Sequence, residues 1–337
     1  MLQALPSIGE KPQSDVSGEW VKGNGLKMAL NKQFAQYLEA REKMQLPAPW
    51  EVSTEEFRFR TLPVTDFIGV PEPIFSVEHR VISGPNSYLS IRIYRPSDEP
   101  NLPVMLYIHG GGWVIGSMDG FEPTVRSLSN KANCVVVQVQ YQKAPEHPFP
   151  GPFNDCYATL EWIVKNAAIL KIDARKIGVG GDSAGGNLAA AIALKARDTG
   201  LVKLAFQMLV YPCTGHDAEL PTAISNAEGF GLTSKVMRWF ESQYAPNESD
   251  LINPYAFPAY AKDLSNLAPA IVVTAEFDPL ADDGRLYAES LEKAGVHTIF
   301  KEYAGAIHGF NALAGVAPDV ATDVQTFLAD GINSLLL

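Results

Sequence analysis

Long apolar runs and cysteines are both scarce in this sequence. None of its apolar runs approaches the roughly 20 residues that a transmembrane helix needs. The first residues, MLQALPSIGEKPQSDV, also lack the basic and apolar regions of a secretory signal. The cysteines are few and odd in number and stand among apolar neighbours, which predicts buried, reduced thiols at Cys134, Cys156 and Cys213. Together these features predict a cytoplasmic protein with no membrane partner.

Basic residues are also in the minority. The 27 lysines and arginines are outnumbered by 38 aspartates and glutamates, for a formal net charge of −11. Because no basic run occurs anywhere, nucleic acid and anionic membranes are excluded as the main partner. By contrast, 46% of the residues are apolar and 19% are charged. This balance predicts a globular chain with a substantial core, since disordered chains have fewer apolar residues and more charge.

From about residue 74, strand-like and helical segments alternate. The segments SVEHRVIS and LSIRIYRP alternate apolar and polar residues on either side of a turn at 84–86, which predicts an antiparallel hairpin. Later apolar runs predict strands at 104–108, 135–141, 177–181, 205–211, 270–276 and 297–303. Helices are predicted near 121–132, 152–168, 184–197, 281–294 and 318–336. This order predicts an α/β fold with a mostly parallel central sheet of about eight strands and helices on both faces.

An amphipathic helix is predicted near the N-terminus, over residues 24–46. Its apolar residues recur at helical spacing, at Leu26, Leu30, Phe34 and Leu38. The polar face carries charges of both signs, which favours packing on the protein over lying on a membrane.

A long insertion interrupts the alternation of strands and helices. It separates the predicted strands 205–211 and 270–276, and it is far longer than an ordinary connection. Placed at the carboxyl ends of the strands, it is expected to form an α-helical cap together with the N-terminal segment. The predicted division is therefore a cap segment at 1–55, core at 56–213, a cap insertion at 214–260 and core again at 261–337.

The stretch VGGDSAGGN at 179–187 places four glycines and a serine between a strand-like and a helical segment. A dinucleotide-binding G-x-G-x-x-G would need glycine where Ser183 stands, and a P-loop would need lysine after its last glycine. The pattern that fits is G-x-S-x-G at 181–185, a strained turn that exposes the serine hydroxyl. It predicts a nucleophile at Ser183, although the pentapeptide alone leaves close helix packing open as an alternative.

Three consecutive glycines follow the predicted strand 104–108, in HGGGW at 109–113. Their N–H groups are unshielded and lie at the same edge of the sheet as Ser183. Acyl transfer needs such fixed donors, because negative charge develops on the carbonyl oxygen. We predict an oxyanion hole formed by the N–H groups of Gly111, Gly112 and Ala184, the last at the N-terminus of a helix.

A serine nucleophile needs a base, and six histidines are available. His308 follows the last predicted strand in a glycine-flanked loop, so both its position and elimination of the others select it. The orienting acid is expected after the preceding strand, where Asp278 stands just past the strand end. Glu276 and Asp282 are alternatives. The chain order Ser–Asp–His is the one expected of α/β hydrolases.

Five stretches occur in order along the chain: HGGGW (109–113), YQKAPEHPFP (141–150), GGDSAGGN (180–187), DPL (278–280) and HGF (308–310). Their order and spacing resemble those of the hormone-sensitive-lipase-like esterases, also called bacterial family IV, of the α/β-hydrolase fold. The likeness runs from about residue 75 to the C-terminus, and Asp182 resembles the aspartate of the GDSAG subgroup. It implies a triad of Ser183, Asp278 and His308 with the oxyanion hole predicted above.

The resemblance also implies an activity. It points to a serine carboxylesterase that hydrolyses small-molecule esters of short to medium acyl chains through an acyl-enzyme intermediate, without cofactor or metal. A homodimer through the last strand and helix is a further expectation. A specialised amidase or lactonase would use the same triad, and a non-catalytic ligand receptor of this fold is the alternative from a different class.

Four aromatic residues are candidates for lining the acyl or alcohol pocket. Trp113 belongs to the glycine loop, and the predicted cap helix 234–244 contains Trp239, Phe240 and Tyr244. Plain packing between the cap and the body is the alternative for all four.

Overall fold

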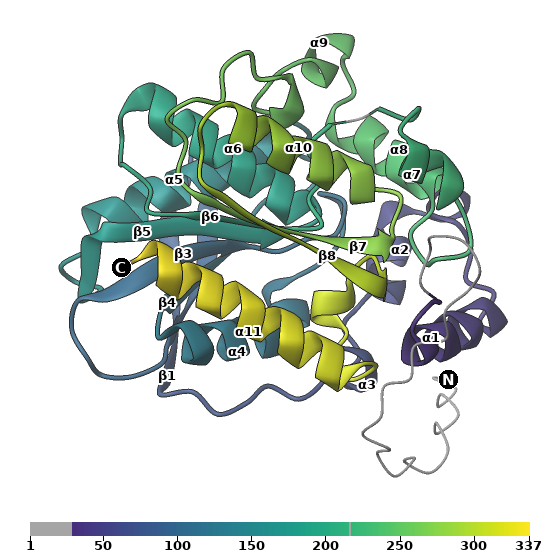
Figure 1. Ribbon diagram of the computed structural model, residues 1–337, viewed down its shortest axis with the longest axis horizontal. Helices are drawn as coiled ribbons and strands as arrows, with labels where there is room; N and C mark the ends of the chain where they lie inside the picture. The colour runs from purple at the N-terminus through teal and green to yellow at the C-terminus, as the bar shows by residue number, and fades with distance from the viewer. Residues whose placement is uncertain (1–28, 216) are drawn as a thin grey trace.

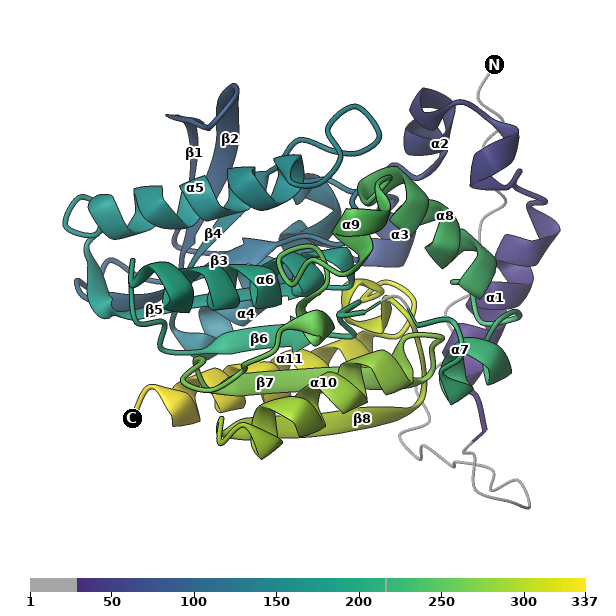
Figure 2. The same cartoon turned by 90° about the horizontal axis from the view of Figure 1, so that it is seen from above.

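An eight-stranded sheet runs through the middle of the molecule (Figure 1). This computed structural model describes residues 29–215 and 217–337. The strand order is β1-β2-β4-β3-β5-β6-β7-β8, as Figure 2 shows from above. Strand β2 is antiparallel to both of its neighbours, and all other neighbouring pairs are parallel. The predicted hairpin and mostly parallel sheet are confirmed. The strands are β1 (Ser76–Ser83), β2 (Tyr88–Arg95), β3 (Leu102–Ile108), β4 (Val135–Gln140), β5 (Ile172–Asp182), β6 (Gln207–Val210), β7 (Ala270–Phe277) and β8 (Thr298–Ile307).

Helices cover both faces of this sheet, as Figure 1 shows with the sheet nearly edge-on. α5, α6 and α10 lie on one face, and α4 and α11 lie on the other. Apolar residues at helical spacing let each helix bury one side against the sheet. The predicted helices are confirmed as α4 (Glu122–Ala132), α5 (Gly151–Lys165), α6 (Ala184–Thr199), α10 (Ala281–Lys293) and α11 (Pro318–Leu335).

Side chains from both faces of the central strands form the core. Successive residues of β3 point to opposite sides, so Leu106 packs with the layer under α5 and α6, and Tyr107 with the layer under α4 and α11. Burial on both faces explains why 104–108 reads as a continuous apolar run. The sheet is thereby a rigid platform for the loops that follow its carboxyl ends.

The N-terminal part of the described chain contains α1 (Lys32–Lys43), α2 (Thr54–Arg60) and α3 (Thr65–Ile68). Leu26 of the predicted helix lies outside the described residues. Phe34 of α1 is fully buried in the core, so this helix packs on the protein as predicted. Across the residues that the structure describes, no helix combines the length and the apolar character needed to span a bilayer.

Helix α2 spans the predicted boundary at residue 55. Arg58 of α2 donates hydrogen bonds of 2.8 Å to the carbonyl oxygens of Val114 and Ala144. These contacts dock α2 on the loop after β3. The cap and the core therefore meet within this helix, and the boundary between them does not fall in a linker.

The insertion between β6 and β7 contains α7 (Pro221–Ser225), α8 (Ser234–Tyr244) and α9 (Glu248–Leu251), and α8 matches the predicted helix. Figure 1 shows α1, α2, α7 and α8 gathered at the end of the sheet toward which β7 and β8 point. The rings of Phe57 in α2 and Trp239 in α8 are 5.7 Å apart and join the two parts of the cap. The cap thus covers the edge where ligands bind in open α/β sheets.

Candidate active site

Ser183 lies in the tight turn between β5 and α6. Its backbone has φ +54° and ψ −121°, a conformation that residues with a side chain rarely adopt. Its N–H donates to the carbonyl oxygen of Val210 at 2.9 Å, which holds the turn against the end of β6. The strand–turn–helix context predicted for Ser183 is confirmed.

The two glycines that flank this turn make close backbone contacts. A Cβ atom on Gly181 or on Gly185 would overlap the carbonyl oxygen of Ile108, the last residue of β3. Glycine is required at both positions because a backbone atom cannot move aside as a flexible side chain can. The nucleophile turn and the start of the glycine loop are therefore packed directly against each other.

Three side chains from three different loops meet at this edge of the sheet. Nε2 of His308 lies 2.9 Å from Oγ of Ser183, and its Nδ1 lies 2.6 Å from Oδ2 of Asp278. The other carboxylate oxygen of Asp278 accepts a hydrogen bond of 2.9 Å from the N–H of Leu280. Asp278 is 0% exposed, so its carboxylate is held away from water. This is the arrangement of a nucleophile, a base and an orienting acid.

The two alternative acids face other partners. Glu276 accepts a hydrogen bond of 2.8 Å from the N–H of Gly305. Asp282 accepts one of 3.0 Å from the N–H of Thr222 and pairs with Arg285 at 2.7 Å. Of the three candidates, Asp278 is the one that contacts His308.

The glycine loop supplies two free N–H groups beside the nucleophile turn, and the start of α6 supplies a third. Among the described residues, the N–H groups of Gly111, Gly112 and Ala184 donate to no protein acceptor. Gly111 has φ +117°, which glycine adopts far more readily than other residues. Ala184 is the first residue of α6, where N–H groups have no partner within the helix and the helix dipole is positive. The three predicted donors are thus available to a negatively charged oxygen.

Asp182 links the nucleophile turn to the glycine loop, and sequence reasoning missed this link. Its Oδ1 accepts hydrogen bonds of 2.9 Å from the Tyr107 hydroxyl and 3.0 Å from the N–H of Gly110. Asp182 is 3% exposed. Burial raises the pKa of Asp182 to about 7, outweighing these hydrogen bonds, which lower it. In the sequence, the only indication that Asp182 belongs to the site is its position directly before Ser183.

We expect Asp182→Asn to change the pH dependence of stability. The folded-state pKa of Asp182 is about 7, whereas an unfolded aspartate titrates near about 3.9, so between these values the native state binds more protons. The free energy of unfolding should therefore fall as pH rises from about 5 to 7, by at most about 1.4 kcal/mol per pH unit from this group. Asparagine can still accept from Tyr107 and Gly110 but does not titrate. The variant should become more stable relative to wild type as pH rises.

Urea unfolding at several pH values between about 5 and 8 measures this effect. Asp173→Asn is the control, because hydrogen bonds from Arg175 lower the pKa of Asp173 to about 2 and its charge is constant over that range. A stability difference between wild type and Asp182→Asn that stays the same at every pH would contradict the prediction.

His109 is buried and neutral at the start of the glycine loop. Burial, together with the nearby charge of Lys143, lowers the pKa of His109 to about 3. Its Nδ1 lies 2.8 Å from the Gly110 carbonyl oxygen, so we assign the proton to Nδ1, which then donates to that carbonyl. Tyr141 stacks on the ring at 4.5 Å and donates its hydroxyl to the His109 carbonyl at 2.9 Å. His109 and Tyr141 therefore hold the shape of the loop.

Trp113 and Tyr244 correct the prediction that they line the pocket. Their rings stack with centroids 4.4 Å apart, and both residues are 0% exposed. Nε1 of Trp113 donates to Oδ1 of Asn187 at 3.2 Å, and Nδ2 of Asn187 donates to the carbonyl of Ala256 at 2.8 Å. These contacts join the glycine loop, α6 and the cap insertion. The alternative of plain packing between cap and body fits both residues, because neither is exposed and Phe257 packs edge-on against both rings.

Phe240 and Trp239 are placed differently from each other. A Cβ on Gly112 would overlap the ring of Phe240, so this ring packs directly on the Gly112 backbone. Trp239 is half-buried and packs edge-on against Phe57 of α2. Of the four predicted pocket aromatics, Phe240 is the one that reaches from the cap onto a predicted oxyanion residue.

Known proteins share both the sequence and this architecture. Residues 105–312 match the family described as alpha/beta hydrolase fold. The chain is 40% identical over 251 residues to esterase LipI of Mycobacterium tuberculosis, covering 73% of this chain and 78% of that protein. It is 42% identical over 238 residues to carboxylesterase NlhH of the same organism, covering 69% and 74%. An ester hydrolase from the metagenome of Lake Arreo, solved with a bipyridine phosphonate derivative, has a TM-score of 0.86 and 35% identity, covering 91% and 99%.

Proposed function

Because this chain belongs to the alpha/beta hydrolase fold family, in its hormone-sensitive-lipase-like group, and is a carboxylesterase, we propose that Ser183, His308 and Asp278 are its catalytic triad. The observation that carries this proposal is the pair of contacts made by His308, at 2.9 Å to Ser183 and 2.6 Å to Asp278. The proposed substrate is a small carboxylic ester with a short to medium acyl chain, hydrolysed without a cofactor.

The first half of the reaction acylates the enzyme. Oγ of Ser183 attacks the ester carbonyl carbon while Nε2 of His308 takes the hydroxyl proton. The carbonyl electron pair moves onto the oxygen, where the three N–H groups of the oxyanion hole stabilise the charge. Asp278 accepts the Nδ1–H of His308 and stabilises the imidazolium. The bond to the alkoxy group then breaks, and the alcohol leaves with the proton from His308.

The second half releases the acid. His308 takes a proton from water, and the water oxygen attacks the acyl carbon. The same N–H groups hold the second tetrahedral intermediate. When it collapses, the bond to Ser183 breaks, the carboxylic acid leaves, and the proton returns from His308 to Oγ.

The surroundings of the nucleophile support a substrate of limited size. Ser183 is 7% exposed, and the Phe240 ring lies against Gly112. A panel of p-nitrophenyl esters of increasing acyl length, with one amide and one lactone added, tests the proposed substrate class. An optimum beyond about ten carbons, or faster cleavage of the amide or lactone than of any ester, would contradict it.

We expect Phe240→Ala to shift the preference toward longer acyl chains. Removing the ring opens space beside Gly112, and each additional buried methylene is worth about 1 kcal/mol or more. The ratio of kcat/KM for the octanoate ester to that for the acetate ester should rise about 10-fold. Phe59→Ala is the matched control, since Phe59 of α2 is 66% exposed, and its ratio should stay within about 2-fold of wild type. Equal shifts in the two variants would place Phe240 outside the acyl site.

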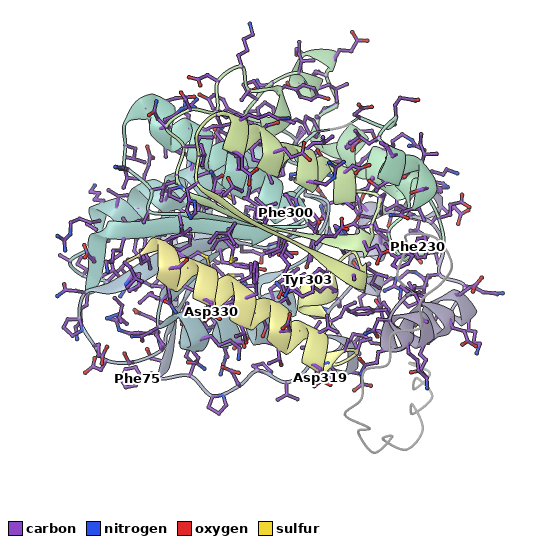
Figure 3. The ribbon with its side chains drawn as sticks, in the orientation of Figure 1. Phe75, Phe230, Phe300, Tyr303, Asp319 and Asp330 are labelled. Atoms are coloured by element: carbon purple, nitrogen blue, oxygen red, sulfur yellow. The ribbon has the colours of Figure 1, made fainter. Side chains whose placement is uncertain are left out.

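A homodimer through β8 and α11 is part of this proposal. In the described sheet β8 is one of the two edge strands and pairs with β7. Figure 3 shows Phe300 and Tyr303 on this strand, and Phe300 is 36% exposed. The outer backbone of an edge strand can pair with a second copy. Sedimentation of the wild-type protein tests this, and a monomer at every concentration would refute it.

A cytoplasmic location is also proposed. All three cysteines lie within the described residues, and each is a buried free thiol: Cys134, Cys156 and Cys213. Thiols kept in this state are typical of reducing compartments.

A further inference from the structure

The cap insertion holds the backbone of the turn that carries Asp278. We call residues 276–283 the acid turn. Asn226, directly after α7, is 0% exposed, and its Nδ2 donates to the carbonyl of Glu276 at 2.9 Å and to that of Asp278 at 3.1 Å. A side-chain amide has two N–H donors, so each carbonyl receives one. A residue of the cap therefore holds the peptide group between Glu276 and Phe277 and the one that follows Asp278.

Thr222 of α7 holds the other end of the acid turn. Its N–H donates to Oδ2 of Asp282 at 3.0 Å. Its hydroxyl accepts from the N–H of Asp282 at 2.9 Å and donates to the carbonyl of Pro279 at 3.3 Å. The hydroxyl thus bridges two backbone groups of the turn.

The start of the insertion adds a third attachment, through Asp283. Its carboxylate accepts hydrogen bonds of 2.7 Å from the N–H of Thr214, 3.2 Å from the N–H of Gly215 and 2.8 Å from the Thr214 hydroxyl. Burial raises the pKa of Asp283 to about 6, although these hydrogen bonds lower it. The insertion is therefore bonded to the acid turn at its beginning and again at α7.

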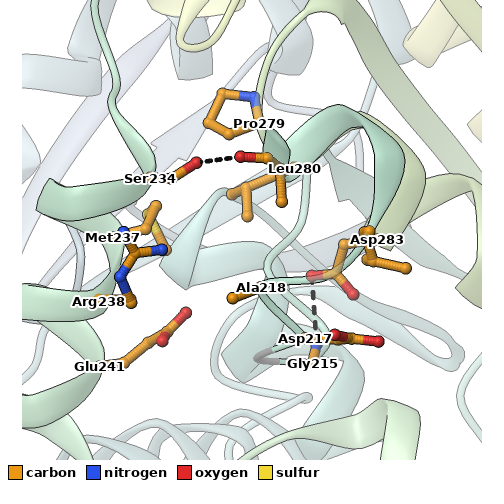
Figure 4. Close-up of a pocket in the computed structure, with 12 residues that line it drawn as sticks. Gly215, Asp217, Ala218, Ser234, Met237, Arg238, Glu241, Pro279, Leu280 and Asp283 are labelled. Carbon is orange, nitrogen blue, oxygen red and sulfur yellow. Dashed lines mark hydrogen bonds between the residues drawn. The ribbon is translucent and has the colours of Figure 1, made fainter. Parts of the chain in front are cut away.

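Figure 4 shows a pocket between helix α8 and the acid turn. Met237, Arg238 and Glu241 of α8 line one side of this pocket, and Leu280 and Asp283 line the other. By contrast, α7 packs directly on α10, the helix that begins within the acid turn. Of these two cap helices, α7 is the one that fixes the acid turn.

We propose that Asn226 and Thr222 are positioning residues for the triad, so that α7 orients the catalytic acid as well as covering the site. The inference rests on the proposed role of Asp278. Because Oδ1 of Asp278 is bonded to the N–H of Leu280 within the same turn, the direction of the carboxylate follows the backbone of the turn. Without Asn226, both carbonyls lose the amide donor, although the Asp278 carbonyl still accepts from the N–H of Ala281 at 3.1 Å, and the carboxylate loses its alignment with His308. Neither residue needs to touch substrate, so the effect falls on kcat.

A double-mutant cycle with p-nitrophenyl acetate tests the proposal. Asn226→Ala should lower kcat about 10-fold or more and change KM less than about 2-fold. In an Asp278→Asn background, Asn226→Ala should lower kcat less than about 2-fold, because the carboxylate that Asn226 orients is absent. The control is Asn247→Ala, which alters an exposed asparagine before α9 and should change neither constant. An equal loss in both backgrounds, or no loss in the wild-type background, would overturn the proposal.

Thr222 provides a second test that does not depend on how Asn226→Ala folds. Thr222→Val removes the hydroxyl at nearly constant shape, and Thr222→Ser keeps it. Thr222→Val should lower kcat about 5-fold, whereas kcat of Thr222→Ser should stay within about 2-fold of wild type. The two variants should have similar melting temperatures. Equal kcat values for the two variants would remove Thr222 from the proposal and overturn the role of α7.

Failure of the triad itself would give a different result. Asp278→Asn alone should lower kcat about 10⁴-fold. If it retained nearly the wild-type kcat, Asp278 would not be the orienting acid, and the proposed function would fail along with the inference. If Asp278→Asn is inactive as expected but Asn226→Ala is not impaired, the inference alone fails.

Discussion

Replacing Ser183 with alanine should lower kcat/KM for p-nitrophenyl acetate by about 10⁵-fold while leaving the fold intact. The Oγ that lies 2.9 Å from His308 is the atom that bonds to the acyl group, and alanine has no atom in its place. The residual rate would come from the oxyanion hole and from binding, which act without the nucleophile. The fold should survive because the backbone of residue 183 is held by its bond to Val210 and by glycine contacts that the substitution leaves unchanged.

A fluorophosphonate probe measures the same prediction without a substrate. It should label the wild-type protein, with the adduct on the peptide that contains Ser183, and should not label Ser183→Ala. Ser242→Ala is the control, because Ser242 is exposed on α8 and should have no effect on either labelling or hydrolysis. Substantial hydrolysis by Ser183→Ala, or an unlabelled wild-type protein, would exclude the mechanism. The second result would also favour a ligand receptor over an enzyme.

Gly185→Ala should destabilise the protein by about 3 kcal/mol and abolish most of the activity. Residue 185 lies in the first turn of α6, where alanine is normally about 1 kcal/mol better than glycine. Here a Cβ would overlap the carbonyl oxygen of Ile108 and crowd the backbone of His109. To accommodate it, α6 must move away from the glycine loop, which separates Ser183 from the oxyanion donors. Steric overlap with a fixed backbone therefore outweighs the gain in helix propensity.

Urea unfolding and p-nitrophenyl acetate hydrolysis together measure this effect. Gly120→Ala is the matched control, since its Cβ would meet a single atom, Cβ of Pro63, at 3.7 Å. The control should stay within about 0.5 kcal/mol of wild-type stability and keep its activity. A Gly185→Ala protein as stable and active as the control would show that the close contact between the two loops is not needed.

Much of the fold and the site could be read from the sequence because those features follow local rules or chain order. Apolar runs and helical spacing depend on which faces are buried, so they revealed the strands and the covering helices. The G-x-S-x-G pattern and the triple glycine each follow a predicted strand of a parallel sheet. In that position, few physical explanations other than an acyl-transfer site account for them. Those patterns selected Ser183, Gly111 and Gly112, and His308 followed from its place after the last strand.

Other features depend on contacts between distant segments, for which a single sequence has no sign. The position just past the strand favoured Asp278 over Glu276 and Asp282, but the contact with His308 comes from the geometry of the acid turn. Trp113 and Tyr244 are aromatic, as residues that line pockets often are, but they stack on each other in the assembled cap and are completely buried.

The sequence by itself determined the α/β architecture and the candidates for nucleophile, base and oxyanion glycines, because these depend on periodicity, backbone room and the order of strands. Only the tertiary structure decided that Asp182 ties the nucleophile turn to the glycine loop and that Asn226 holds the backbone of Asp278. In each case a buried polar side chain must find a partner, and the partner is set by which segments the fold brings together, not by distance along the chain.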